Sequence, residues 1–148
     1  MEDFETSLKI NTISTYAAAK CAVEGFDKLP KSTLKSFLYT GNMLNVTPIP
    51  MLLTLGVGKT ASSHIIESGA SAYAAKGYRY VRRKSVPGLL LINHSFYYVD
   101  ERKEDGSPIG LAINGQAHAD AFFGLASKAE QEPWQWTFVK DKGYIKFN

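Results

Sequence analysis

Hydrophobic positions recur at helical spacing along the first segment of the chain, which predicts a helix over residues 3–28. The apolar stripe consists of Phe4, Leu8, Ala18, Ala22 and Phe26. Acidic residues at the start of this segment suit the positive end of the helix dipole, and Pro30 ends the helix. Asn11 and Thr15 also fall on the stripe, so each is either a satisfied polar group in the core or a polar group positioned for a function.

The next two predicted elements are a strand and a long helix. Residues 36–40 form a short strand-like run, which Gly41 and Asn42 end. From about residue 52 to residue 76 the apolar spacing is helical again, and Gly77 is well placed as a C-terminal cap. The apolar positions of this helix are Val57, Ala61, Ile65 and Ala72 on one side, with Ile66, Ala70 and Tyr73 beside them.

A second strand, a third helix and an extended tail follow. Aromatic residues at 96–99 predict the strand, and residues 114–128 predict the helix, with Asn114 near its N-cap. Residues 136–147 are expected to be extended, with a turn at residues 141–143. Strands that alternate with helices in this order predict parallel pairing, so the fold class is α/β within one domain of 148 residues.

Composition and charge exclude several kinds of protein. A hydrophobic content of 45% is enough for a packed core, and the net charge of +3 does not indicate nucleic-acid or membrane binding. The longest apolar run, residues 89–92, is far shorter than a membrane span, and the acidic N-terminus is not a signal peptide. We therefore expect a soluble cytoplasmic protein.

The histidines have no ligand-like spacing, so no metal is assigned, and the single cysteine, Cys21, is expected to be buried.

Two short motifs could carry chemistry. Tyr16 and Lys20 lie four residues apart on one face of the first helix, where a lysine ammonium would favour the phenolate of the tyrosine. Gly56 to Thr60, Gly-Val-Gly-Lys-Thr, is similar to the end of a nucleotide-binding P-loop, but the first glycine of that motif is replaced by Leu53. Without that glycine the loop cannot surround a phosphate with backbone N–H groups, which argues against an NTPase.

Taken together, the segments resemble the C-terminal part of the short-chain dehydrogenase/reductase family. Residues 4–29 resemble the helix that carries the active-site Asn, residues 36–42 the strand that ends at the catalytic Ser, and residues 55–77 the helix of the Tyr-x-x-x-Lys pair. Three sequences are similar to a fungal branch of the family, namely Phe-Leu-Tyr-Thr-Gly-Asn at 37–42, Phe-Tyr-Tyr-Val-Asp-Glu-Arg at 96–102 and Pro-Trp-Gln-Trp-Thr-Phe at 133–138.

This resemblance implies a Rossmann-like, doubly wound parallel sheet and an NAD(P)-dependent oxidoreductase that acts on a carbonyl or an alcohol. In the family, the Tyr exchanges a proton with the substrate oxygen, and the Lys lowers the pKa of the Tyr and binds the nicotinamide ribose. By position, Asn11 matches the Asn, Lys59 matches the Lys, and Asn42 or Thr40 stands near the Ser position. The Tyr position is Leu55, which cannot transfer protons, so a non-catalytic relative that binds a nucleotide or a partner is the alternative.

The resemblance leaves four further expectations. A second alignment makes Tyr16 and Lys20 the catalytic pair, but it requires a Ser on a strand about thirteen residues earlier, and the sequence has none there. The first strands and the glycine-rich loop of the Rossmann fold are expected upstream of residue 1. Residues 80–95 interrupt the family pattern and are expected to be an insertion or a retained intron, with a genuine loop as the alternative. The two long helices commonly pair across a dimer interface in the family, which gives the expectation of a homo-oligomer.

Overall fold

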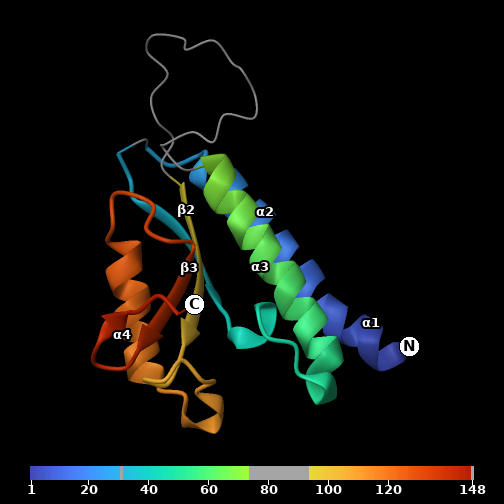
Figure 1. The fold of residues 1–148 in the computed structure, drawn as a ribbon. Helices are drawn as coiled ribbons and strands as arrows, with labels where there is room; N and C mark the ends of the chain where they lie inside the picture. Colours follow the sequence, from blue (N-terminus) through green and yellow to red (C-terminus); the bar gives the residue numbers. More distant parts are fainter. Residues whose placement is uncertain (31, 74–93, 148) are drawn as a thin grey trace.

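The computed structural model describes residues 1–30, 32–73 and 94–147. In these residues a four-stranded sheet carries helices on both of its faces (Figure 1). The elements in chain order are α1 (Glu2–Leu8), the π-helical segment η1 (Lys9–Ile13), α2 (Ser14–Phe26), β1 (Lys35–Thr40), the 3₁₀ turns η2 (Met43–Asn45) and η3 (Pro50–Leu52), α3 (Leu53–Tyr73), β2 (His94–Glu101), the 3₁₀ turn η4 (Gly110–Ala112), α4 (Gly115–Ala126), β3 (Gln135–Val139) and β4 (Gly143–Tyr144).

The sheet has the strand order β1-β2-β3-β4. Strands β1, β2 and β3 are parallel, with Phe37 opposite Phe96, and β4 turns back antiparallel to β3. Asp141 and Gly143 have φ angles of 62° and 74° in the turn between β3 and β4, a conformation that glycine adopts easily. The predicted α/β class, the parallel pairing and this turn are therefore confirmed.

The core lies on both faces of β2, because successive side chains of a strand point to opposite sides. The segments α1, η1 and α2 form one continuous helix that lies beside α3 on one face, whereas α4 covers the other (Figure 1). The buried residues of the first face are Ala19, Ile66, Ala70, Phe96 and Tyr98. Those of the second face are Tyr97, Val99, Leu125 and Phe138. All eight residues of β2 are buried, as expected for a strand covered on both faces.

Several sequence expectations need correction. Cys21 is exposed, so the expected buried thiol is wrong. Val57, expected on the apolar side of α3, is exposed, whereas Ile66 and Ala70 are buried as expected and are joined by Ser62. Of the segment 80–95, residues 80–93 lie outside the described residues, whereas His94 and Ser95 begin β2 and pair with β1. Among the described residues, no helix is long and apolar enough to span a bilayer.

Candidate active site

A cavity of about 350 Å³ opens at the carboxyl ends of the parallel strands. Ligands of open α/β sheets bind at this edge, because the loops that leave the strands surround it. The lining residues come from the end of β1 and the turns after it, from α3, from the end of β2, from the segment between β2 and α4, and from α4. They include Thr40, Asn42, Leu55, Lys59, Asp100, Glu101 and His118. The cavity therefore brings together four of the positions that the sequence marked, namely Thr40, Asn42, Leu55 and Lys59.

Lys59 reaches the edge of the sheet from the second turn of α3. Its ammonium nitrogen Nζ donates to Tyr39 Oη at 3.2 Å and to the carbonyl oxygen of Thr40 at 3.2 Å. The same nitrogen lies 4.7 Å from the centroid of the Tyr39 ring, which is within cation–π range. An ammonium has three N–H groups, so these two acceptors leave one N–H for a group in the cavity.

Tyr39 was missed by the sequence reasoning, which searched for a tyrosine at helical spacing from the lysine. Burial alone raises the pKa of the Tyr39 hydroxyl, but a hydrogen bond with Ser62, the charge and hydrogen bond of Lys59, and a hydrogen bond with Thr15 outweigh it. The resulting pKa lies below the usual tyrosine value. Tyr98, whose ring centroid is 5.7 Å from that of Tyr39, has the opposite shift, because burial raises its pKa strongly.

Asn11 lies in the π-helical segment η1, a form of helix that is frequent at functional sites. The Asn11 carbonyl oxygen accepts hydrogen bonds from the hydroxyl of Ser62 on α3 and from that of Thr15 on α2. The Asn11 side chain donates to the Ser7 carbonyl oxygen at 3.1 Å. Asn11 thus packs against α3 next to Lys59, at Gly58, but it is not among the residues that line the cavity.

Asn42 lies in the turn that leaves β1. Its side-chain oxygen accepts from the backbone N–H of Leu44 at 3.1 Å and so caps the turn η2. Gly41 makes this turn possible, because a Cβ atom there would lie 2.0 Å from the ring of Tyr98. The rigid turn holds Asn42 and Thr40 at the mouth of the cavity.

The rival pair occupies a different surface. Tyr16 and Lys20 lie on α2, where the Tyr16 side chain is 62% exposed and Lys20 forms an ion pair of 3.7 Å with Glu24. Neither residue lines the cavity at the carboxyl edge. Their shallow pocket is formed with the C-terminal half of α3 and with Phe96 instead.

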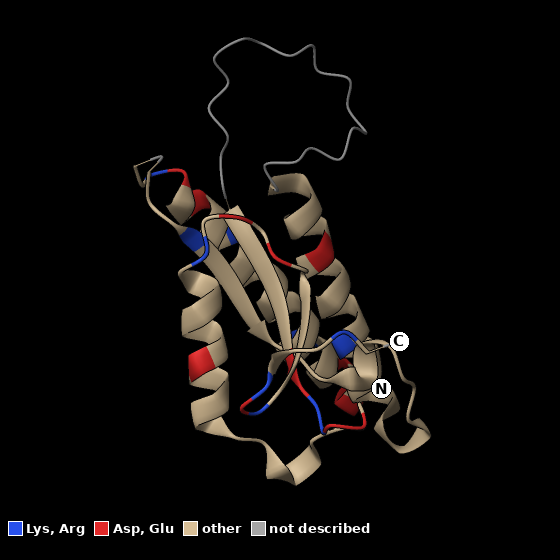
Figure 2. Ribbon diagram, turned by 60° about the vertical axis from the view of Figure 1, so that its left-hand side comes forward, with Lys and Arg blue, Asp and Glu red and all other residues tan. Residues whose placement is uncertain are grey.

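Buried charges at the end of β2 form one wall of the cavity, where acidic and basic positions follow each other along the chain (Figure 2). Asp100 accepts from Arg102 Nε at 2.6 Å and pairs with Arg102 Nη2 at 2.6 Å. Burial raises the pKa of Asp100, and the charges of Arg102, His118 and Lys59 oppose that shift. Glu101 accepts from the backbone N–H of Asn114 at 2.8 Å and lies 3.3 Å from His118 Nδ1.

His118 was also missed, because the sequence offered no partner at metal-ligand spacing. The ring lies on α4, its Nδ1 is 3.1 Å from the carbonyl oxygen of Asn114, and its Nε2 is buried without a hydrogen-bond partner in the described residues. Its neighbours are the rings of Phe122 and Phe138. The described residues contain no group of three His, Cys, Asp or Glu side chains that could hold a metal ion.

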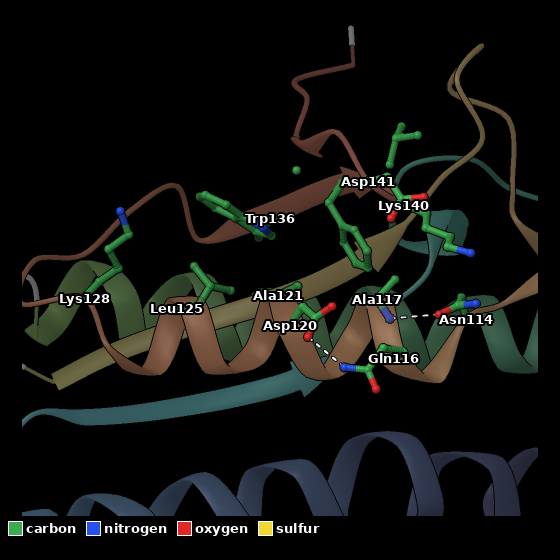
Figure 3. A pocket seen from close by; sticks show the side chains of 14 residues that line it. Asn114, Gln116, Ala117, Asp120, Ala121, Leu125, Lys128, Trp136, Lys140 and Asp141 are labelled. Atoms are coloured by element: carbon green, nitrogen blue, oxygen red, sulfur yellow. Dashed lines mark hydrogen bonds between the residues drawn. The ribbon is translucent and has the colours of Figure 1, made fainter.

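A second cavity, of about 490 Å³, lies between α4 and the β3–β4 hairpin (Figure 3). Figure 3 shows Ala117, Ala121 and Leu125 of α4 on one side and Trp136 on the other. Its polar rim holds two local hydrogen bonds, from Gln116 to Asp120 at 2.8 Å and from the Ala117 N–H to Asn114 at 2.9 Å. None of the site residues expected from the sequence lines this cavity.

The P-loop-like motif forms no loop. Gly56 to Thr60 lie inside α3, which begins at Leu53, so their backbone N–H groups belong to the helix. Gly58 is instead the place where α3 meets η1, since a Cβ atom there would lie 2.7 Å from Asn11 Cβ. The resemblance to a phosphate-binding loop therefore has a packing explanation.

The comparisons with known proteins agree with this architecture. Over 144 residues, or 97% of its length, the chain is 43% identical to "Short chain dehydrogenase/reductase dmxR12" of Cryptosporiopsis sp. (strain 8999). The chain spans about half of that relative, 52% of its length. No protein-family model and no solved structure matches the chain. The chain belongs to the short-chain dehydrogenase/reductase family and corresponds to part of a member's length.

Proposed function

We propose that this protein is an NAD(P)-dependent oxidoreductase that interconverts a carbonyl and an alcohol at the carboxyl edge of the sheet. The observation that carries the proposal is Lys59, which lines the cavity there and has one N–H beyond the two used by Tyr39 and Thr40. The relative of 43% identity bears the name of a short-chain dehydrogenase/reductase, which supports the same activity.

The residues present fit the nicotinamide end of the cofactor. The remaining N–H of Lys59 can donate to one oxygen of a ligand in the cavity, and the cavity lies where α/β sheets bind nucleotides. When bound, the nicotinamide supplies or accepts the hydride. In this proposal Asn42 orients the substrate from its capped turn, and Asn11 fixes the distance between η1 and α3.

The alternative is a relative that binds the nucleotide without catalysis. Leu55 favours it, because this apolar side chain lines the cavity at the position of the family's tyrosine. A leucine cannot donate or accept a proton, and general acid–base catalysis contributes about 10²- to 10⁴-fold to the rate of a reaction.

The test separates binding from turnover. The purified protein is titrated with NADPH and with reduced nicotinamide mononucleotide, which probes the nicotinamide end alone, and then mixed with a panel of aldehydes and ketones. We expect both ligands to bind and Lys59→Met to weaken binding at least 10-fold. Binding of the ligands without turnover of any carbonyl in the panel would support the non-catalytic alternative. If neither ligand bound, both the proposed activity and the alternative would be excluded. Lys20→Met is the matched variant: if it abolished binding and Lys59→Met did not, the rival alignment would be correct.

We also propose that η1 and the start of α3 contact a second copy of the chain. Apolar side chains are exposed there, at Ile10, Ile13, Leu53 and Val57. Exposed apolar patches of this kind mark association surfaces. Light scattering should give the mass of a dimer for the protein, and Val57→Glu should shift it towards the monomer. A monomer at all concentrations would contradict this proposal without affecting the proposed activity.

A further inference from the structure

We propose that Tyr39 and Lys59 form the proton-exchange pair of this chain, in which the Tyr39 hydroxyl acts through the Lys59 ammonium. The inference rests on the proposed oxidoreductase function. It assigns proton transfer to another pair of residues, because Leu55, at the position of the family's tyrosine, cannot transfer a proton. Neither the position of Tyr39 on a strand nor its distance of twenty residues from Lys59 follows from the family's Tyr-x-x-x-Lys spacing.

The contact joins two rigid elements. Tyr39 is the penultimate residue of β1 and Lys59 lies in the second turn of α3, with 3.2 Å between Oη and Nζ. The second bond of Nζ, to the carbonyl oxygen of Thr40, ties the lysine to the same strand end. Lys59 lines the cavity, so a proton on Nζ is in reach of a substrate oxygen, whereas Tyr39 is reached through Nζ.

Two hydroxyl groups, of Ser62 on α3 and of Thr15 on α2, act on the Tyr39 phenol and lower its pKa. In this structure both hydroxyls donate to the carbonyl oxygen of Asn11, so the bond from Lys59 Nζ is the hydrogen bond that Tyr39 Oη receives. The charged and titratable groups that face Tyr39 are Lys59 from α3 and Tyr98 from β2. The Lys59 ammonium and the neighbouring hydroxyls together outweigh the effect of burial, so the pKa of Tyr39 lies below the usual tyrosine value. A phenol in this setting gives up its proton more readily than an ordinary tyrosine.

The proposed steps balance. In reduction, a bound nicotinamide would supply the hydride to the carbonyl carbon, and the carbonyl oxygen, which then holds the former π electron pair, needs a proton. That oxygen takes a proton from Lys59 Nζ, which leaves a neutral amine. Tyr39 Oη gives its proton to this amine, and the phenolate is protonated again by solvent. In alcohol oxidation the same transfers run in reverse, with solvent as the final acceptor of the proton.

The first test needs no catalysis. The absorbance of tyrosinate is followed with pH in the protein and in Tyr39→Phe, because the chain has eight tyrosines and the difference isolates one of them. We expect the wild-type curve to contain one tyrosine that ionises below the ordinary value of about 10, which Tyr39→Phe removes. Lys59→Met should shift that ionisation to higher pH. An unchanged low-pH component in Tyr39→Phe would overturn the inference.

The second test compares turnover in two tyrosine variants. Tyr39→Phe should lower kcat about 100-fold or more and flatten the pH profile while NADPH binds as in the wild type. Tyr144→Phe, on β4 beside Trp136, should keep the wild-type rate. Wild-type kcat and pH profile in Tyr39→Phe would overturn this inference alone. A wild-type protein that binds no NADPH and turns over no carbonyl would overturn the proposed function, and the absorbance titration would still report on the pair.

Discussion

The hydroxyl group of Tyr98 closes a two-way hydrogen bond with the backbone of Asn42, although the two residues are 56 positions apart. It donates to the Asn42 carbonyl oxygen at 2.9 Å and accepts from the Asn42 N–H at 3.1 Å. A single phenol therefore satisfies both backbone groups of the residue that leaves β1. The central strand thereby fixes the turn at the cavity mouth.

Removing this hydroxyl should loosen the turn. We expect Tyr98→Phe to lower the free energy of unfolding by about 1–3 kcal/mol, because two partly buried backbone groups lose their partner. Urea unfolding measures the loss, and hydrogen exchange should show faster exchange at the Asn42 amide. Unchanged exchange at Asn42 would mean that the turn is held by the cap on η2 rather than by Tyr98.

Two glycines of α3 offer a matched test of the contact between the helices. A Cβ atom at Gly58 would lie 2.7 Å from Asn11 Cβ, whereas one at Gly56 would have no neighbour within 4 Å. We expect Gly58→Ala to destabilise the protein by about 1–3 kcal/mol, since η1 must move away from α3. Gly56→Ala should stabilise it by up to about 1 kcal/mol, because alanine is the better helix former. Thermal unfolding of both variants checks the sign, and equal effects would exclude a packing role for Gly58.

Most of the helices and strands could be predicted from the sequence, because the spacing of apolar residues reflects which face of each helix or strand is buried. The helix over residues 3–28, the strand at 36–40 and the cap at Asn114 all correspond to elements of the structure. The π-helical segment could not be foreseen from periodicity. In retrospect its signal is the pair Ser14 and Thr15, whose hydroxyls bond back to carbonyl oxygens four residues earlier.

The site was predictable only in part, for a physical reason. Spacing rules along a helix find pairs that share one helix face, which is why Tyr16 and Lys20 drew attention. The contact of Lys59 with Tyr39 joins a helix to a strand, and it depends on tertiary packing that no local pattern encodes. Asp100 and Arg102 escaped notice because alternating charges usually mark a solvated strand, whereas here both side chains are buried.

Breaking the buried pair of Asp100 and Arg102 should cost far more stability than breaking a surface pair. Asp100→Ala leaves the Arg102 guanidinium buried with only the Gly106 carbonyl oxygen, at 3.0 Å, as a described partner. We expect a loss of about 3–5 kcal/mol in the free energy of unfolding. Lys20→Ala, which breaks the exposed pair with Glu24, should cost about 0–1 kcal/mol. Chemical denaturation compares the two, and similar small losses would show that water reaches Arg102.

A variant that lacks both charges shows how much of the loss in stability comes from leaving one buried charge unpaired. Asp100→Leu combined with Arg102→Met should be less destabilised than Asp100→Ala alone, because it leaves no unpaired charge in the wall of the cavity. A double-mutant cycle gives the coupling energy between the two side chains. Additive losses would contradict a direct interaction, despite the 2.6 Å contact.

His94 should make the stability of the fold depend on pH. The ring is buried between the rings of Phe26 and Tyr73, with centroid distances of 5.0 and 5.1 Å, and neither nitrogen has a hydrogen-bond partner in the described residues. Burial lowers the pKa of His94, the charge of Lys35 lowers it further, and Asp27 opposes the shift. The folded state therefore takes up a proton less readily than the unfolded state.

The sign of the pH effect follows from this lowered pKa. The stabilisation is complete above the unfolded value of about 6.5 and is lost as the pH falls from there through the folded value. Urea unfolding at pH 5 and at pH 8 should show a lower free energy of unfolding at pH 5, and His94→Phe should reduce that difference while keeping the aromatic packing. His64→Gln, at an exposed position of α3, should leave the pH dependence unchanged. A pH dependence that survives in His94→Phe would assign it to the carboxylates instead.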